Sequence, residues 1–350
     1  MNKTSTLILS VLFCLLMFRA NGQDKQFSQF YTAPLYLNPA LTGVFEGSFR
    51  ISLNYREQYN SILSSFPSRT VHASFDKKHR VGKNDYFSYG VNVLQDQAGE
   101  SLFAQYRGNL SASYMKQLSG SKYSSQSQYL VAGAQLGIGQ NKLDPGRLWF
   151  SAQWDEPTIS VNQGANNLEP NLNNASNVFL DFNAGLLWYT RIDENTSFYI
   201  GGALNHISPV EISLYEGESE TLYTRWVGHA GAELPLSREL SVLPAVLVMG
   251  QGPSFQTNLG ANFRYSNNDW RELAIRAGLW GRLSRALDSS HIDAVIVSTI
   301  LEMERFQLGL SYDINASSLR DASQNRGAFE VSLMYTHPAK ERFKLNCPKF

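Results

Sequence analysis

The sequence predicts an all-β fold, a transmembrane antiparallel β-barrel of the outer-membrane type with about 14 strands and a plug-like amino-terminal segment. Three observations predict it. Apolar and polar residues alternate along most of the chain, the amino terminus has the features of an export signal, and short connections alternate with long ones. The composition agrees, because only 17% of the residues are charged and 12% are aromatic, a mixture that suits strands better than helices.

Residues 1–22 are the first predicted element, a cleaved signal peptide. Lys3 supplies the positive charge, residues 7–18 are an almost unbroken apolar run, and small residues stand three and one positions before the cleavage point. The alternatives are a signal anchor, for which the run is short, and a lipoprotein signal through Cys14, which a bulky residue precedes. We therefore expect an exported protein of the Gram-negative outer membrane.

Residues 23–46 form an irregular segment ahead of the first strand. Its two prolines prevent a regular helix or a central strand, while its aromatic residues demand burial. We expect it to fold into the lumen or across the periplasmic mouth, as a plug or as a docking surface for a protein partner. The alternative is an irregular lead-in packed on the base of the barrel. The candidate partner-binding residues here are Phe27, Phe30, Tyr31, Pro34, Leu37, Asn38 and Pro39.

Residues 47–336 are the predicted barrel. The stretch 48–55 shows the pattern, with aromatic and aliphatic residues at odd positions and polar residues at even ones, which is the period of a half-buried strand. Similar stretches start near residues 70, 86, 104, 129, 180, 197, 223, 240, 254, 272, 293, 306 and 327. Most are near ten residues long, about the length that a tilted strand needs to cross a bilayer.

A large soluble β-sandwich or a lipocalin-like barrel is the alternative fold, because alternation does not say whether the apolar faces meet lipid or each other. Polar residues in mid-strand, such as Arg50, Arg107 and Asp181, favour the membrane barrel, since they suit a wet lumen. Aromatic residues near strand ends also favour it, as an interfacial girdle requires. These are Tyr55, Tyr86, Trp188, Tyr189, Trp226, Trp280 and Tyr335.

The connections indicate which end of the barrel faces the periplasm. The links expected at one end are residues 58–69, 97–101, 140–177 and 207–222, several of which are long, and tight links are expected at 191–196, 234–239, 267–270 and 303–305. Outer-membrane barrels have their short turns on the periplasmic side. The longest link carries Trp149, Phe150 and Trp154, which we predict as partner-binding anchors. Alternatively, this loop folds back and constricts the lumen.

The carboxyl-terminal region supplies a second group of candidates. Polar residues of the last hairpin, together with Arg56, could form a network on the lumen side or in the loop, or they could only fix the register of the closing strand. Members of this predicted network are Arg56, Asp313, Asn315, Arg320 and Glu330. Residues 337–350 are expected to be a basic periplasmic tail. Within it, Cys347 is either buried or pairs with another chain; burial is favoured.

The sequence does not predict an enzyme, a metal site or a cofactor site. The 30 Lys and Arg residues balance the 30 Asp and Glu residues, so no electrostatic footprint for nucleic acid is present. The six histidines lack metal-ligand spacing. A hydrolase at the barrel rim would use residues such as His206, His229 and Ser208, but no nucleophile elbow or orienting acid accompanies them.

Three groups of residues carry a resemblance to a known family. The first is residues 26–43, which end in Leu37-Asn38-Pro39-Ala40-Leu41-Thr42-Gly43, followed by residues 55–59. The second comprises residues 311–315, 318–320 and 327–333, and the third is the tail at 347–350. In order and spacing these segments are similar to the PorP/SprF family of type IX secretion system membrane proteins of the Bacteroidetes.

The resemblance implies a non-enzymatic outer-membrane barrel that supports the export or surface display of a gliding or adhesin-type protein. The implied partners are a secreted adhesin or its type B carboxyl-terminal secretion domain, other type IX secretion components and outer-membrane lipid. From the residues alone, a passive channel for hydrophobic or small solutes is the alternative function.

Overall fold

The computed structural model describes residues 24–60, 66–82, 84–120, 126–162, 164–193, 195–267, 273–286, 289–318, 320–339 and 347. The predicted signal peptide at residues 1–22 lies outside these ranges. Fourteen antiparallel strands form one closed barrel, which β1 (Phe49–Gln58) and β18 (Arg326–His337) close by pairing with each other. The predicted antiparallel barrel and its strand count are confirmed.

The remaining barrel strands follow in chain order. They are β2 (Ser68–Val81), β3 (Asp85–Ala98), β4 (Phe103–Gly120), β5 (Ser127–Lys142), β8 (Phe179–Arg191), β9 (Ser197–Asn205), β12 (Arg225–Pro235), β13 (Leu240–Gln251), β14 (Ser254–Tyr265), β15 (Leu273–Ala286), β16 (Ser289–Met303) and β17 (Phe306–Asn315). Each pairs with its neighbour in sequence, as in an up-and-down barrel. Among the described residues, no helix is long and apolar enough to cross a membrane.

The two faces of the wall differ as the alternation predicted. In β1, Ile51, Leu53 and Tyr55 point outward and are exposed, whereas Arg50 and Arg56 point inward and are buried. A soluble protein would bury the apolar face instead. The inverted pattern is that of a wall with lipid outside and polar groups inside, so the soluble sandwich is excluded.

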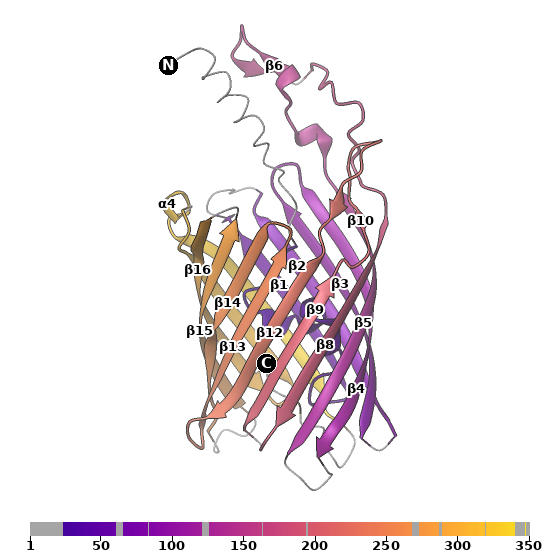
Figure 1. The fold of residues 1–350 in the computed structure, drawn as a ribbon. Helices are drawn as coiled ribbons and strands as arrows, with labels where there is room; N and C mark the ends of the chain where they lie inside the picture. Colours follow the sequence, from indigo (N-terminus) through magenta and orange to yellow (C-terminus); the bar gives the residue numbers. More distant parts are fainter. Residues whose placement is uncertain are drawn as a thin grey trace, which may run out of the picture.

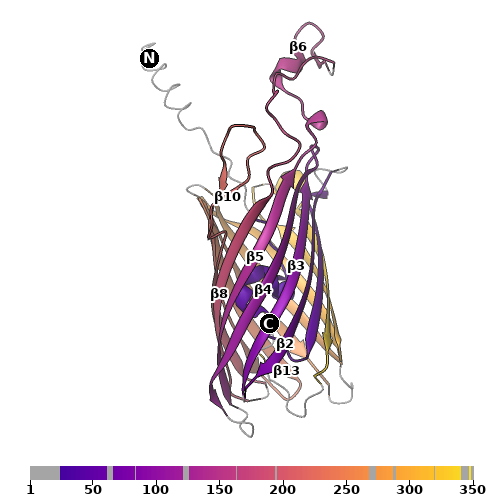
Figure 2. The same cartoon turned by 90° about the vertical axis from the view of Figure 1, so that its right-hand side faces the viewer.

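The longest connections all lie at one end of the barrel (Figures 1 and 2), although the turns at residues 99–102 and 252–253 share that end and are as short as those at the other. The long end carries the loops at residues 143–178 and 206–224, each with a two-stranded sheet of its own. These sheets pair β6 (Trp154–Asp155) with β7 (Ser160–Val161), and β10 (Val210–Glu211) with β11 (Thr221–Leu222). Three short helices also lie at this end: η3 (Pro145–Arg147), η4 (Ser151–Gln153) and α4 (Arg320–Ser323). Because β5 runs on to Lys142, the longest loop begins slightly later than expected.

Three short helical turns precede β1: η1 (Phe30–Thr32), α2 (Pro34–Leu37) and η2 (Pro39–Leu41). Each proline opens a turn, where its missing N–H costs nothing. The side chain of Asn38 caps η2 by accepting a hydrogen bond of 2.8 Å from the N–H of Ala40. The prolines therefore break the chain into turns short enough to fit within the barrel.

The predicted aromatic girdle is wrong at three positions, one of which is Tyr86, a partly buried residue of β3 that packs against the apolar cluster inside the barrel. Trp280 is 2% exposed and Tyr189 is 0% exposed, and both belong to the apolar cluster inside the barrel. Both residues point inward according to the alternation of their own strands. The direction of a side chain therefore follows from its odd or even position along the strand, and closeness to the strand end predicts it less well.

Candidate functional site: the amino-terminal segment inside the barrel

Residues 24–46, here called the amino-terminal segment, run along the inside of the barrel (Figure 2). Asp24 contacts Arg225, the first residue of β12, and Gln251, the last residue of β13. Both of these residues lie at the end with the long loops. At the other end of the segment, the N–H of Gly43 donates a 2.7 Å hydrogen bond to Asp76, beyond the middle of β2. The segment thus runs through the lumen from the half nearer the long loops towards the short turns.

A first charged cluster holds the amino end of the segment. The Asp24 carboxylate lies 2.6 Å from His206 Nε2, 3.3 Å from Arg225 Nη1 and 3.5 Å from Arg107 Nη2. His206 Nδ1 lies 3.0 Å from Asp181. Burial alone would raise the pKa of Asp24, but these cations outweigh burial and hold the pKa well below its usual range. Asp24 is therefore a buried anion that the wall neutralises.

A second cluster surrounds Ser28. Its hydroxyl donates to Asp313 at 2.7 Å and accepts from Arg282 at 2.6 Å and from Arg56. Glu330 accepts the N–H groups of Ser28 and Gln29, at 2.7 and 3.0 Å. Arg56 lies 2.9 Å from Asp313 and 3.2 Å from Glu330. Four buried charges from β1, β15, β17 and β18 thus fix two residues of the segment.

The middle of the segment fits against the backbone of the wall. Asn38 donates to the carbonyls of Leu186 and Gly202, both at 3.2 Å, and contacts His229 Nε2 at 3.0 Å. Close approach is possible because the wall has glycines here. A Cβ on Gly133 would lie 2.4 Å from the carbonyl carbon of Pro39, and one on Gly185 would lie 2.0 Å from Asn38 Oδ1. These glycines form a recess that the segment occupies.

The carboxyl end of the segment is held by β1 and β2. Arg50 donates to both carboxylate oxygens of Asp76, at 3.0 and 2.8 Å, and to the carbonyl of Leu41 at 3.1 Å. The guanidinium also lies 4.8 Å from the centre of the Phe45 ring. Arg50, predicted to line a wet lumen, is instead 3% exposed beneath the segment.

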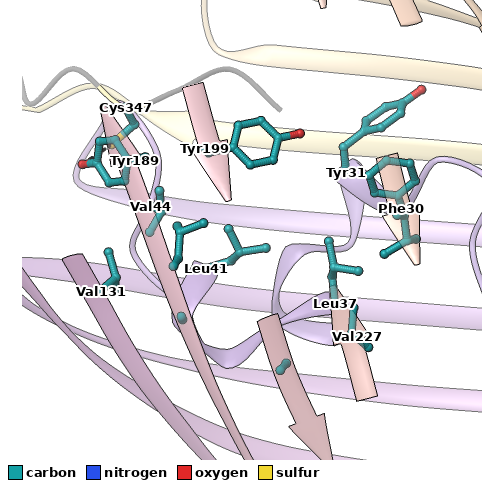
Figure 3. Close-up of a cluster of buried hydrophobic side chains, with 14 of the residues drawn as sticks. Phe30, Tyr31, Leu37, Leu41, Val44, Val131, Tyr189, Tyr199, Val227 and Cys347 are labelled. Atoms are coloured by element: carbon teal, nitrogen blue, oxygen red, sulfur yellow. Dashed lines mark hydrogen bonds between the residues drawn. The ribbon is translucent and has the colours of Figure 1, made fainter. Parts of the chain in front are cut away.

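An apolar cluster joins the segment to the wall (Figure 3). Phe30 packs edge-on against Trp280 at a centroid distance of 5.4 Å, and Tyr31 lies 5.8 Å from the same ring. Further along, Leu37, Leu41 and Val44 belong to the same cluster as inward-facing wall residues. The wall residues labelled in Figure 3 are Val131, Tyr189, Tyr199 and Val227. Cys347 is buried in this cluster, as predicted.

Sequence reasoning missed this apolar belt inside the lumen. Its signal was present as breaks in the alternation, where apolar residues occupy both faces of a strand. Examples are residues 186–189 in β8 and 246–249 in β13. A wall that is apolar on both faces needs an apolar partner within the lumen as well as lipid outside.

The candidate partner-binding residues fall into two groups. Those of the segment, Phe27, Phe30, Tyr31, Pro34, Leu37, Asn38 and Pro39, are all buried between the segment and the wall. A partner could reach them only if the segment left the lumen. In contrast, Trp149 and Trp154 in the loop at 143–178 are 45% and 50% exposed, and Phe150 is partly buried beside them.

The candidate network of the last hairpin also falls into two groups, one around Ser28 and one in the loop that follows β17. Arg56, Asp313 and Glu330 meet around Ser28. Asn315 is buried at the edge of the loop that follows β17, where it hydrogen bonds to Ser317 and Ser323. Arg320 lies in α4 with its side chain exposed beside Asp321. Arg282, which the sequence did not single out, completes the cluster, because β15 lies two strands from β17 in the barrel.

The two histidines considered for a rim hydrolase both contact the segment: His206 through Asp24 and His229 through Asn38. Within the described ranges, no group of three or more His, Cys, Asp or Glu residues could hold a metal ion. The role that this arrangement supports is structural, because the buried charges pair inside the lumen and hold the segment in place.

Comparisons with known proteins identify the family. The family model described as "Type IX secretion system membrane protein PorP/SprF" matches residues 20–335. No curated protein matches the chain.

Solved structures that are similar to the chain include three barrels. A TodX monoaromatic hydrocarbon channel deltaS2 mutant is 12% identical with a TM-score of 0.49, over 87% of this chain and 93% of that one. The Ralstonia pickettii toluene transporter TbuX is 12% identical with a TM-score of 0.44, over 87% and 92%. CdiB from Acinetobacter baumannii is 7% identical with a TM-score of 0.44, over 82% and 60%. Since the family match spans most of its length, the chain belongs to the PorP/SprF family and is an outer-membrane barrel component of the type IX secretion system.

Proposed function

We propose that this barrel is a closed surface anchor: it holds a secreted adhesin with a type B carboxyl-terminal domain at the cell surface, and its amino-terminal segment acts as a plug. Membership of the family implies work with other type IX secretion components. The identity of the cargo, its docking site and the role of the segment are the proposal. No nucleotide-binding motif occurs in the sequence, so energy for export has to come from other components.

The observation that carries this proposal is the number of wall strands that bind the segment. Hydrogen bonds or ion pairs reach it from β1, β2, β3, β4, β5, β8, β9, β12, β13, β15, β16, β17 and β18. To pass a polypeptide through the lumen, all of these contacts would have to break. An anchor needs no such opening, and the same contacts would make it rigid.

We place the docking site on the loop at residues 143–178 rather than on the segment. Trp149 and Trp154 project from the outer end of the barrel and are about half exposed, at 45% and 50%. Exposed tryptophans on a long loop are effective anchors for a protein partner, because each buries a large area at a low entropic cost. The buried aromatic residues of the segment lack this access.

Affinity purification from the native outer membrane tests the anchor role. The wild-type protein should co-purify with a secreted protein that carries a type B carboxyl-terminal domain, and the double variant Trp149→Ala, Trp154→Ala should lose most of it. A matched control is Trp226→Ala, which removes a 43% exposed tryptophan of β12 from the wall instead of from the loop. Equal recovery of the adhesin with both variants would refute docking through the loop.

The passive channel remains the competing function, and flux measurements separate the two. A closed anchor reconstituted in liposomes should show no swelling in sugars or small aromatic solutes. Steady solute uptake by the purified wild-type protein, without any protein partner, would favour the channel instead.

A further inference from the structure

The loop at residues 206–224 is fastened to the amino-terminal segment at both of its ends. His206, which opens the loop, lies 2.6 Å from Asp24. Arg225, which follows the loop, lies 3.3 Å from the same carboxylate and donates to the hydroxyl and the carbonyl of Tyr36, at 3.2 and 3.3 Å. Gln251 adds a third link, because it accepts from the N–H of Asp24 and donates to the carbonyl of Tyr223.

His206 holds an unfavourable backbone conformation at this junction. Its φ is +56°, in the left-handed region that residues with a Cβ rarely adopt. Its N–H donates to Asn183 at 2.9 Å, its carbonyl accepts from Thr224 at 3.0 Å, and its ring lies between Asp24 and Asp181. Such a conformation persists only while its surroundings enforce it. Loss of Asp24 would remove one of the contacts that enforce this conformation and so loosen the start of the loop.

The outer part of this loop is joined to the loop that carries the exposed tryptophans. The N–H of Asn173 donates to the carbonyl of Leu214 at 2.8 Å, and that of Glu216 donates to Asn171 at 2.9 Å. Between these bonds, Leu172 and Tyr215 face each other as an antiparallel bridge. The backbone of the 206–224 loop, which the pairing of β10 with β11 braces, thus connects these bonds to His206 and Arg225 at the amino end of the segment.

We propose that the joined outer loops and the amino-terminal segment form one allosteric unit. Restricting the motion of the loops stabilises the contacts that His206 and Arg225 make with the segment. The coupling is reciprocal, so loosening the segment also loosens the loops. This inference deepens the proposed function by assigning a regulatory link between docking and the lumen. The coupling itself is a property of the chain alone and can be measured without a partner.

A reversible cross-link between the loops provides the test. In the full-length double variant Leu172→Cys, Tyr215→Cys, oxidation should lock the bridge, and reduction should release it in the same protein. Hydrogen exchange at the amides of residues 26–33 should be slower in the oxidised form by about 5-fold or more, the lower end of typical couplings. Adding His206→Gln should abolish this difference.

The control cross-link joins two residues within one loop. Asp155 and Ser160 pair across the β6–β7 hairpin, so Asp155→Cys, Ser160→Cys should lock that hairpin without changing exchange in the segment. Unchanged exchange at residues 26–33 in the oxidised Leu172–Tyr215 pair would overturn the proposal. So would an equal slowing in the control.

A second variant approaches the coupling from the segment. Asp24→Asn keeps the shape of the side chain but removes its charge, and it should accelerate exchange both at residues 26–33 and at the loop amides of residues 212–216. Acceleration confined to the segment would overturn the coupling. Because neither test involves cargo, a negative result leaves docking through Trp149 and Trp154 intact, and failed docking leaves the coupling intact.

Discussion

At the scale of single residues, buried charges in the lumen account for the polar face of the strands. Arg56, Asp313 and Glu330, which were candidates for a network on the lumen side or in the loop, are buried on the inner face of the wall. Their partner Ser28 could not be predicted, because the hydroxyl of Ser28 and the carboxylate of Asp313 are separated by 285 positions in the sequence. The alternation predicts which way a side chain points, but it does not predict which residue that side chain contacts.

Removal of one buried charge tests the cluster around Ser28. Glu330→Ala leaves Arg56 and the N–H groups of Ser28 and Gln29 without their acceptor, so it should destabilise the folded barrel by about 3–5 kcal/mol. Thermal unfolding followed by the mobility of heated samples on gels measures the effect. The control Glu304→Ala removes an exposed carboxylate that pairs with Arg305 and should leave the unfolding temperature unchanged. Equal stability of both variants would contradict the cluster's role.

The pair of His206 and Asp24 should make stability depend on pH. Burial alone would lower the pKa of His206, but Asp24 and Asp181 outweigh burial and raise the pKa above 6.5. A raised pKa stabilises the fold fully below 6.5, and this contribution is lost as the pH rises through the higher folded-state value. Asp24, whose pKa is lowered, stays ionised throughout this window.

The difference in unfolding temperature between the wild type and His206→Gln should therefore shrink from pH 6 to pH 9. Arg107, Arg225 and Asp181 also face this pair, but all three are present in both proteins, so the change reports the imidazole. A difference that is constant with pH would show that His206 is not protonated against Asp24.

At the scale of elements, the amino-terminal segment and the glycines of the wall fit each other. The sequence predicted burial of the segment from its aromatic residues and prolines. The position of its recess was not predictable, since Gly133 and Gly185 read only as strand glycines. Their significance appears when β5 and β8 are placed beside η2, where a side chain would collide with the segment.

Gly133→Ala tests this recess. The new Cβ would meet backbone atoms of Pro39 and Ala40 at 2.4–2.5 Å, so it should displace η2 and destabilise the protein by about 1–3 kcal/mol. Hydrogen exchange at residues 40–44 should accelerate. Gly108→Ala in β4 is the matched control, because nothing lies within 4 Å of its added Cβ. Unchanged exchange in Gly133→Ala would mean that the segment does not sit in the recess.

At the scale of the whole molecule, the barrel followed from local patterns and the contents of the lumen did not. Alternation, turn chemistry and loop asymmetry act over a few residues, so they predicted the strands and the closure of β1 on β18. The apolar belt around Trp280 depends on which inward positions meet the segment, and this is set by the barrel's closure. Trp280 was accordingly predicted to lie in the interfacial girdle, whereas it packs inside the barrel.

Single-channel recording in planar bilayers tests the central claim, that the chain's own segment closes the lumen. The full-length protein should insert without conducting, whereas a variant lacking residues 26–43 should give stable pores while retaining the gel mobility of a folded barrel. Steady conductance by the full-length protein, equal to that of the deletion variant, would contradict the account.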